Sequence, residues 1–213
     1  MEYRAQEYVR DVLSGKITVC RLVRLAVERH VSDLSRVEDP AYPYYFDEDS
    51  AKYTIDFFQF LKHSKGEWAG RPVELEPWQQ FITWSRFGWR REDGYRRFSK
   101  AYVEVARKNG KTTMAAATAN YCFLADRPVE VGPEVYCVAT KRDQAKIAWS
   151  EAERQISGHP VLRRMTRTYM QSSTVTMPGT AARMMPLGQD SKTEDGLNPH
   201  FVLVDEYHAH PDH

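Results

Sequence analysis

The stretch VEVARKNGKTTMAAA, residues 103–117, starts like a buried strand and breaks over a cluster of Arg, Lys, Asn and Gly. It then resumes as an alanine-rich run. A strand, a short cationic loop and a helix in this order bring backbone N–H groups to the positive end of the helix dipole, where anions bind. The stretch therefore predicts a phosphate-binding loop between a strand over 100–106 and a helix over 112–125.

The residue types in this loop suit the phosphates of a nucleotide. Gly110 lets the backbone approach without a Cβ, Lys111 supplies a charge for the β- and γ-phosphates, and Thr112 offers a hydroxyl to Mg²⁺. The standard pattern also has a glycine five positions before Gly110, where this chain has Val105. On this stretch alone, an ordinary basic loop remains the alternative.

The chain after residue 98 alternates apolar runs with helical patterns. Such alternation predicts an α/β fold with a mainly parallel sheet flanked by helices. The segments that we expect are strands at 134–140 and 200–206, a helix at 142–156, and two short strands around the Pro-Gly turn within STVTMPGTAARMMPL.

The N-terminal part is different in character, because it carries helical periodicity without apolar strands. We expect two helices within 3–38, a helix over 51–63 capped by Asp49 or Ser50, and an aromatic-faced helix in PWQQFITWSRFGW. The predicted division is a helical segment over 1–70 and a nucleotide-binding core over 71–213.

A second motif lies at the end of the last apolar run. FVLVDE places Asp205 and Glu206 directly after the strand expected at 200–206. Ligands bind outside the carboxyl ends of the strands in an open parallel sheet, and phosphoryl transfer needs a carboxylate near the metal and a group that orients water. We therefore expect Lys111 to face these two acids. A cap of a helix or turn is the alternative for Asp205.

The bulk composition is that of a globular chain of 213 residues with a formal net charge of +1. Attraction to nucleic acid must therefore come from local clusters of cations. No apolar run approaches the roughly 18 residues that span a bilayer. Cys20, Cys122 and Cys137 show no CxxC spacing, and we expect them to be reduced, small buried residues of a cytosolic protein.

Taken together, the chain resembles the N-terminal ATPase half of the large terminase subunit of tailed bacteriophages. The segments that carry the resemblance are LEPWQQF, ARKNGKT, VATKRDQAKI and DGLNPHFVLVDEYHAH. The early glycine is commonly missing in that family. The resemblance implies a P-loop NTPase of the RecA/ASCE-like type, an ATP-driven motor that pushes double-stranded DNA into a preformed capsid shell.

The same resemblance implies roles for individual residues. Lys111 would bind the β- and γ-phosphates, Thr112 and Asp205 would hold Mg²⁺, and Glu206 would polarise the hydrolytic water. Gln79 would read the adenine, with the neighbouring Gln80 as its competitor and a surface glutamine on an amphipathic helix as the alternative. The phosphate loop would comprise Arg107, Lys108, Asn109, Gly110, Lys111, Thr112 and Thr113. Arg107 would also neutralise transition-state charge, and a solvated or DNA-facing side chain is the alternative.

The implied partners are ATP, Mg²⁺, double-stranded DNA, the portal protein, the small terminase subunit and further copies of the chain in a ring, in the cytoplasm of the bacterial host. The sequence stops at HAHPDH, before the coupling strand and the nuclease of that family. We therefore expect no nuclease activity, an unfinished sheet edge and weak or absent turnover in isolation, as for a fragment, a split gene product or a prophage remnant. A non-hydrolysing nucleotide-binding or assembly module is the alternative, followed by a helicase-type ATPase.

Two further clusters of residues each have an ordinary structural explanation as the alternative to a functional one. His200, His208, His210 and His213 lie near Asp205 and Asp212 in the sequence, but the spacing is not that of a zinc site. WRREDGYRRFSK, residues 89–100, reads as a hairpin whose cations contact DNA phosphates or form an ordinary solvated face. Its cations are Arg90, Arg91, Arg96, Arg97 and Lys100.

Overall fold

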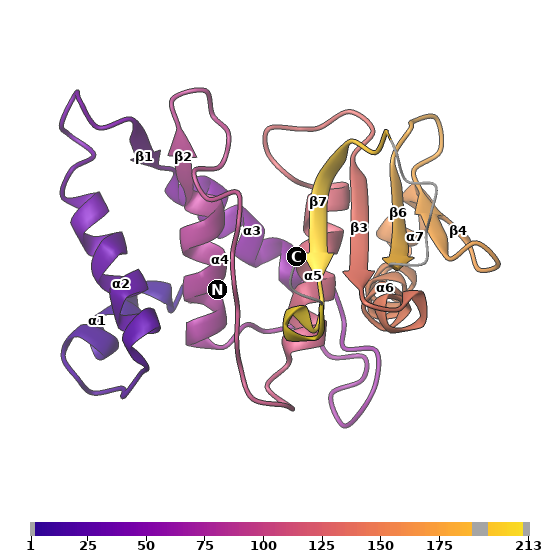
Figure 1. Ribbon diagram of the computed structural model, residues 1–213, viewed down its shortest axis with the longest axis horizontal. Helices are drawn as coiled ribbons and strands as arrows, with labels where there is room; N and C mark the ends of the chain where they lie inside the picture. The colour runs from indigo at the N-terminus through magenta and orange to yellow at the C-terminus, as the bar shows by residue number, and fades with distance from the viewer. Residues whose placement is uncertain (1–2, 189–195, 211–213) are drawn as a thin grey trace. The chain divides into compact units, whose positions relative to one another are not determined.

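The computed structural model describes residues 3–188 and 196–210 (Figure 1). The chain forms two compact units, each built from two separate stretches of sequence. The first unit contains Met1–Asp56 and Glu74–Glu104, and the second contains Phe57–Val73 and Val105–His213. The division predicted at residue 70 rested on sequence character rather than on packing, and it stays a prediction.

The first unit is mainly helical, as the periodicity predicts. Its elements are α1 (Ala5–Leu13), α2 (Arg21–Leu34), β1 (Tyr44–Phe46), most of α3 (Glu48–Phe60), α4 (Pro77–Gly88) and β2 (Trp89–Arg91), with β1 and β2 paired antiparallel. Five buried residues from α1, α2 and α4 form its cluster of apolar side chains: Tyr8, Val9, Val12, Val27 and Phe81. No helix in the described part of the chain is both long and apolar enough to cross a membrane.

Two helix starts in this unit depend on local side-chain hydrogen bonds. Helix α4 begins with a capping box, in which the Glu76 N–H donates to Gln79 Oε1 at 3.0 Å. Helix α3 begins earlier than predicted, and the expected cap at Asp49 or Ser50 is wrong because both residues lie inside the helix. Asp47 precedes it instead, and its Oδ1 accepts a hydrogen bond from the Ser50 N–H at 2.9 Å.

The predicted hairpin at 89–100 is present, since Arg90 and Arg96 form an antiparallel bridge. Two of its cations, however, do not face solvent. Arg90 is only 2% exposed, and Arg97 donates to Asp33 Oδ2 at 2.6 Å. Tyr42 donates to the other oxygen of Asp33, also at 2.6 Å. The interpretation of Arg90 and Arg97 as DNA-facing or solvated side chains is therefore wrong, because both are part of the interior of this unit.

The second unit is an α/β structure around a five-stranded sheet with the order β4-β5-β6-β3-β7. The central strand β3 pairs in parallel with β6 and β7, whereas β5 pairs antiparallel with β4 and β6. The strands are β3 (Glu134–Ala139), β4 (Arg167–Tyr169), β5 (Thr174–Thr176), β6 (Arg183–Gly188) and β7 (Pro199–Val204). The predicted α/β class is confirmed, and the sheet is mixed.

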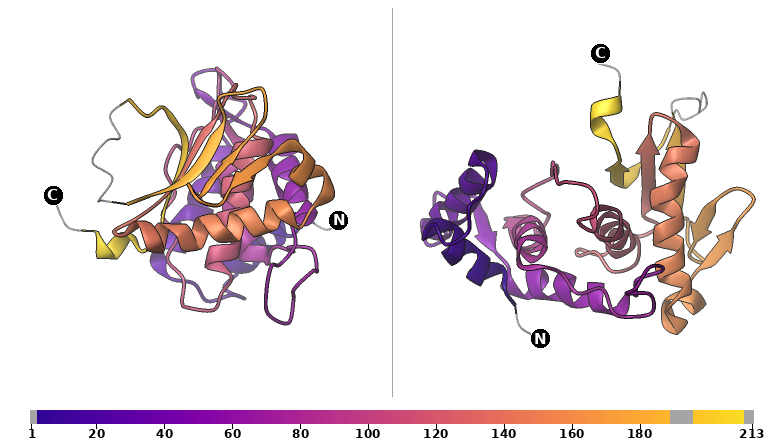
Figure 2. Two further views of the ribbon diagram at one scale, coloured as in Figure 1. Left: turned by 90° about the vertical axis from the view of Figure 1, so that its right-hand side faces the viewer. Right: turned by 90° about the horizontal axis from the view of Figure 1, so that it is seen from below.

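Helices α5 (Lys111–Leu124) and α6 (Arg142–Ser157) pack against each other and against the sheet, and α5 lies behind strand β7 in Figure 1. Figure 2 shows α6 running along the strands from two further sides. Small side chains permit this close packing, because Ala116, Ala117 and Ala119 of α5 are completely buried. A short helix, α7 (Pro160–Met165), and a 3-10 turn, η1 (Tyr207–Ala209), complete the unit.

The strand predicted at 100–106 is absent. Residues 101–106 have no regular secondary structure, and four of them are exposed. An apolar pattern makes a strand only where a neighbouring strand supplies hydrogen bonds, and within the described ranges no strand pairs with this segment. Strand β7, which pairs there with β3 alone, stands at an edge of the sheet.

The cysteines divide into two kinds. Cys122 and Cys137 are buried, as expected, whereas Cys20 is exposed, so the prediction is wrong for Cys20. Burial, with a smaller contribution from the carboxylate of Asp205, raises the pKa of the Cys137 thiol to about 12. This thiol therefore stays neutral and unreactive near neutral pH.

The buried His30 gives the first unit a defined response to acid. Burial lowers its pKa to about 4, while Asp33 raises it and Arg29 lowers it further. An unfolded chain, with a histidine pKa of about 6.5, binds a proton in this window that the folded chain does not bind. The free energy of unfolding should have its full value above pH 6.5 and fall by about 3 kcal/mol as the pH approaches 4, because protons then bind the unfolded chain in preference to the folded one.

The measurement is urea unfolding, followed by tryptophan fluorescence, at several pH values. His30→Phe should flatten the dependence between pH 6.5 and 4, whatever it does to stability at neutral pH. An unchanged slope in the variant would show that other groups cause the acid response.

Candidate functional site

The loop before α5 turns sharply through two left-handed residues. Gly110, which precedes the helix, has φ 71°, and Lys108 has φ 69°. Gly110 adopts this conformation without steric cost, whereas a side chain at Lys108 makes it uncommon. The Asn109 side chain donates to the carbonyl of Ala106 at 3.1 Å, which closes the turn. The loop therefore leads directly into the helix start.

The first turn of α5 is electropositive. It contains no acidic residue, and no side chain caps it. The first backbone N–H groups of a helix have no partner inside the helix, and they carry the positive end of its dipole. Lys111 is the first helical residue and adds a full charge. The arrangement suits an anion such as a phosphate.

The two sequence motifs meet at this point. Lys111 Nζ lies 3.5 Å from Glu206 Oε1 and 3.9 Å from Asp205 Oδ1. The acids reach it because β7 pairs in parallel with β3, and the Asp205 N–H continues the ladder by donating to the carbonyl of Val138 at 2.9 Å. The side chains that we expected to face each other are therefore in contact.

Glu206 has an unusual backbone. Its φ of 50° and ψ of 48° place it in the left-handed region, which costs a non-glycine residue about 1–3 kcal/mol. Its N–H donates to Asp205 Oδ1 at 3.1 Å, and its second oxygen lies 3.4 Å from His208 Nδ1. The chain turns at this residue into η1. Such strain recurs at functional sites, and here it directs the end of the strand.

The contacts of Lys111 are weak enough to be exchanged. The side chain of Lys111 is 40% exposed, and those of Asp205 and Glu206 are 22% and 36% exposed. Exposed ion pairs contribute about 0–1 kcal/mol. A ligand whose anion binds Lys111 more strongly therefore breaks these ion pairs at little cost in free energy.

The remaining residues of the predicted site fall into two groups. Arg107 and Lys108 are exposed on the loop, and in the part of the chain that the structure describes neither has an acidic partner within 4.0 Å. Thr112 and Thr113 are half-buried in the first turn of α5. All four belong to the second unit, with Lys111 and both acids.

Gln79 and Gln80 belong to the first unit. Both are buried, and both stabilise the start of α4. Gln79 Oε1 takes part in the capping box, while Gln80 accepts from the Arg4 N–H at 2.8 Å and donates to the Leu75 carbonyl at 3.1 Å. These contacts favour a structural role for Gln80. The adenine role implied for Gln79 stays a prediction.

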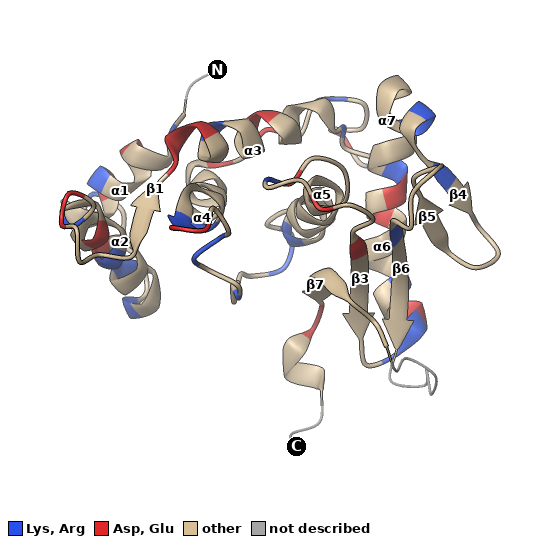
Figure 3. Ribbon diagram, turned by 90° about the horizontal axis from the view of Figure 1, so that it is seen from above, with Lys and Arg blue, Asp and Glu red and all other residues tan. Residues whose placement is uncertain are grey.

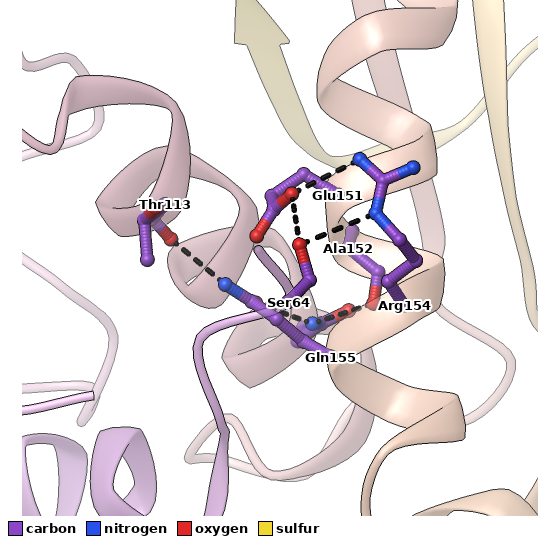
Figure 4. A network of polar contacts seen from close by, with 7 residues as sticks. Ser64, Thr113, Glu151, Ala152, Arg154 and Gln155 are labelled. Carbon is purple, nitrogen blue, oxygen red and sulfur yellow. Dashed lines mark hydrogen bonds and ion pairs between the residues drawn. The ribbon is translucent and has the colours of Figure 1, made fainter. Parts of the chain in front are cut away.

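The sequence analysis missed two amides beside the helix start. The Gln155 side chain on α6 donates to the carbonyl of Thr113 at 3.2 Å, and it accepts from Asn120 Nδ2 at 3.0 Å (Figure 4). Gln155 and Asn120 are completely buried. The sequence could have indicated them, because each is an amide side chain among the alanines of its helix. Through Gln155, α6 holds the first turn of α5 in place.

A second contact joins α6 to the segment after α3. Glu151, only 2% exposed, accepts from Ser64 Oγ at 2.7 Å and from Arg154 Nη2 at 3.0 Å. Figure 4 shows these side chains beside the Gln155 network. A buried carboxylate needs such partners, so the segment 61–73 is anchored to α6 by a charge that cannot be left unpaired.

The chemistry of the donors fits Mg²⁺ rather than zinc. Within residues 3–188 and 196–210, no three His, Cys, Asp or Glu residues gather as a metal cluster; His213 and Asp212 lie outside the described residues. Mg²⁺ is commonly bound through one or two carboxylates, with water and phosphate as its other ligands. Asp205 and the hydroxyl of Thr112 offer oxygen ligands of this kind.

Comparison with known families identifies one match. The model of the family described as "Terminase large subunit, ATPase domain" matches residues 77–213, more than half of the chain. The chain belongs to this family. Its membership favours the terminase interpretation over a helicase-type ATPase, and it makes ATP hydrolysis the general activity of the matched domain.

A solved structure supports the same fold. The chain is similar to the large terminase of bacteriophage HK97 with a TM-score of 0.60 and 20% sequence identity, over 72% of this chain and 30% of that chain. At this identity the likeness shows the P-loop NTPase-like fold alone. The chain thus corresponds to less than a third of the HK97 protein. No curated protein matches the sequence.

Removing the Gln155 amide tests its role in holding α5. In Gln155→Leu, the Thr113 carbonyl loses a donor and the buried Asn120 amide loses an acceptor, so the free energy of unfolding should fall by about 1–3 kcal/mol. Gln144→Leu on the same helix, where no side-chain hydrogen bond is lost, should stay within about 0.5 kcal/mol of the wild type. Equal losses in both variants, measured by urea unfolding, would refute a specific role.

Proposed function

We propose that this chain binds ATP and Mg²⁺ at the loop 107–113 and the acids 205–206, and that it hydrolyses the γ-phosphate as the motor portion of a phage terminase. The observation that carries the proposal is the contact of Lys111 with Asp205 at 3.9 Å and with Glu206 at 3.5 Å, at the uncapped start of α5. The family membership supports the choice of ATP as ligand.

In the proposed complex the phosphates lie against the start of α5. Backbone N–H groups of the loop donate to phosphate oxygens, and Lys111 shifts from the acids towards the β- and γ-phosphates. Thr112 and Asp205 are the residues that would hold Mg²⁺. Bound Mg²⁺ neutralises charge on the β- and γ-phosphates. Lys111 thereby exchanges its carboxylate partners for phosphate oxygens while its backbone stays at the start of α5.

Glu206 is the residue that we assign to the attacking water. Its carboxylate orients the water and accepts its proton as the γ-phosphate bond breaks. The left-handed backbone at Glu206 fixes the direction in which this carboxylate leaves the strand. Arg107, exposed on the loop, is the residue of this chain that would offset charge on the γ-phosphate in the transition state.

Hydrolysis would drive double-stranded DNA into a capsid through the portal, in a ring of identical subunits with the small terminase subunit, in the cytoplasm of the bacterial host. These partners are proposed from the family.

Ligand binding is tested by thermal unfolding with ATP and Mg²⁺. At about 100 times the dissociation constant, ATP should stabilise the wild type by about 2.7 kcal/mol. Lys111→Ala should remove most of this shift, because the phosphates lose their charged donor. Lys146→Ala, which removes an exposed charge from α6, should keep it. A wild type without any shift at millimolar ATP would overturn the proposal.

A second candidate function, nucleotide binding without steady turnover, is favoured by one observation. In the part of the chain that the structure describes, the segment 101–106, which leads into the loop, forms no strand and is largely exposed, so the loop does not follow a strand. Phosphate release distinguishes the two functions. Steady release by the wild type that is lost in Glu206→Gln, with the ATP-induced shift retained, supports the hydrolysing motor. A shift in the wild type without release supports the binding module.

A further inference from the structure

The first unit contains a cleft of about 270 Å³ between α2, α4 and the segment that follows β2. Its charged lining residues are Arg29, Arg86 and Lys100, one from each of these elements, and its walls include Trp89, Phe98 and Tyr102. Figure 3 marks the Lys and Arg positions of these elements in blue. No carboxylate lines the cleft within the described ranges. It is therefore a cationic site with aromatic walls.

Two cations of the cleft, Arg29 and Lys100, differ from the ion-paired Arg97 of the same unit. Arg97, the neighbour of Phe98, is paired with Asp33. Across the described residues, neither Arg29 nor Lys100 has a carboxylate within 4.0 Å. The Arg29 guanidinium is instead held over the ring of Phe98, 4.5 Å from its centroid, which orients the charge without neutralising it.

Uncharged polar groups in the lining suit the same kind of ligand. Ser85 Oγ is buried and has no hydrogen-bond partner among the residues that the structure describes. His30 Nδ1 accepts from the Trp89 indole N–H at 2.9 Å, so its neutral ring carries the proton on Nε2. Ser85 and the neutral His30 thus accompany the cations among the lining residues.

We propose that this cleft binds one nucleotide unit of a DNA strand that is single-stranded at that point, as at a strand end. Cations that meet phosphate and an exposed aromatic ring that meets a base are the two elements of single-strand recognition. Arg29 and Lys100 take the phosphate, and Tyr102, which is 68% exposed, contacts the base. The volume admits a single nucleotide and excludes the width of a duplex.

This inference deepens the DNA-binding part of the proposed function, and it does not depend on ATP hydrolysis. The cleft belongs to the first unit, whereas the loop 107–113 and the acids 205–206 belong to the second. Loss of one activity should therefore leave the other intact, and the two proposals can fail separately.

The test is fluorescence anisotropy with a short labelled single-stranded oligonucleotide and no ATP, over a range of salt concentrations. Arg29→Gln with Lys100→Gln should weaken binding at least tenfold and reduce the salt slope by about 0.7, for the one single-strand phosphate that the two cations contact. Arg10→Gln with Arg21→Gln removes two exposed charges of the same unit outside the cleft, and binding should stay within about twofold, because the proposal needs no phosphate contact there. Tyr102→Ala should weaken binding at fixed charge, and Tyr102→Phe should restore it.

The outcomes separate the possible ligands. A free deoxynucleoside monophosphate should displace the oligonucleotide from the wild type and not from the cleft double variant. This outcome supports a cleft that binds one nucleotide unit. Binding of duplex with no preference for single strands, or equal losses in the two double variants, overturns the proposal. Lys111→Ala should leave oligonucleotide binding unchanged; if it alone abolishes binding, the strand is held at the loop of α5 and the cleft is refuted. If circular dichroism shows that the double variant does not fold, the single variant Lys100→Gln replaces it, because Lys100 is exposed. Unchanged oligonucleotide binding in Lys100→Gln would then overturn the proposal.

Discussion

The contact of Lys111 with Asp205 and Glu206 depends on the register of one strand pair. Strand β7 lies beside β3, and the Asp205 N–H donates to the Val138 carbonyl. A shift of this pairing by one residue would turn every side chain of the strand to the other face. The acids would then leave Lys111, which the fold places independently at the start of α5. The hydrogen-bond ladder, more than the weak ion pairs, therefore decides whether a site exists.

The position of α5 rests on a compromise between close packing and buried polarity. Alanines let it approach α6 and the sheet, and Asn120 and Gln155 are completely buried at this contact. These amides satisfy each other and hold Thr113, yet Asn120 Oδ1 has no partner among the described residues. A buried polar network of this kind costs stability where it is incomplete and fixes one arrangement where it is satisfied. Here it fixes the turn that carries Lys111 and Thr112.

Local patterns predicted the elements whose signals are local. The alanine-rich run predicted α5, and the apolar run before Asp205 predicted β7. The contact of Lys111 with the acids was expected from the carboxyl ends of two strands, of which the described part of the chain forms only β7. The strand over 100–106 failed because strand formation needs a neighbour that a local pattern does not contain. The Arg97–Asp33 pair was missed for the same reason, since its partners are 64 residues apart. Composition alone made Arg97 look like surface charge.

A formal net charge of +1 gives the chain no general attraction to phosphate, so specific attraction arises where cations lack nearby acids. Among the described residues, Arg107 and Lys108 of the loop and Arg29 and Lys100 of the cleft each have no carboxylate within 4.0 Å. They differ in their surroundings. A helix dipole and two carboxylates beside the loop suit a phosphate that arrives with a metal ion. Aromatic walls and a neutral histidine in the cleft suit a phosphate attached to a base. The groups packed around the cations thus decide which kind of phosphate ligand each site suits.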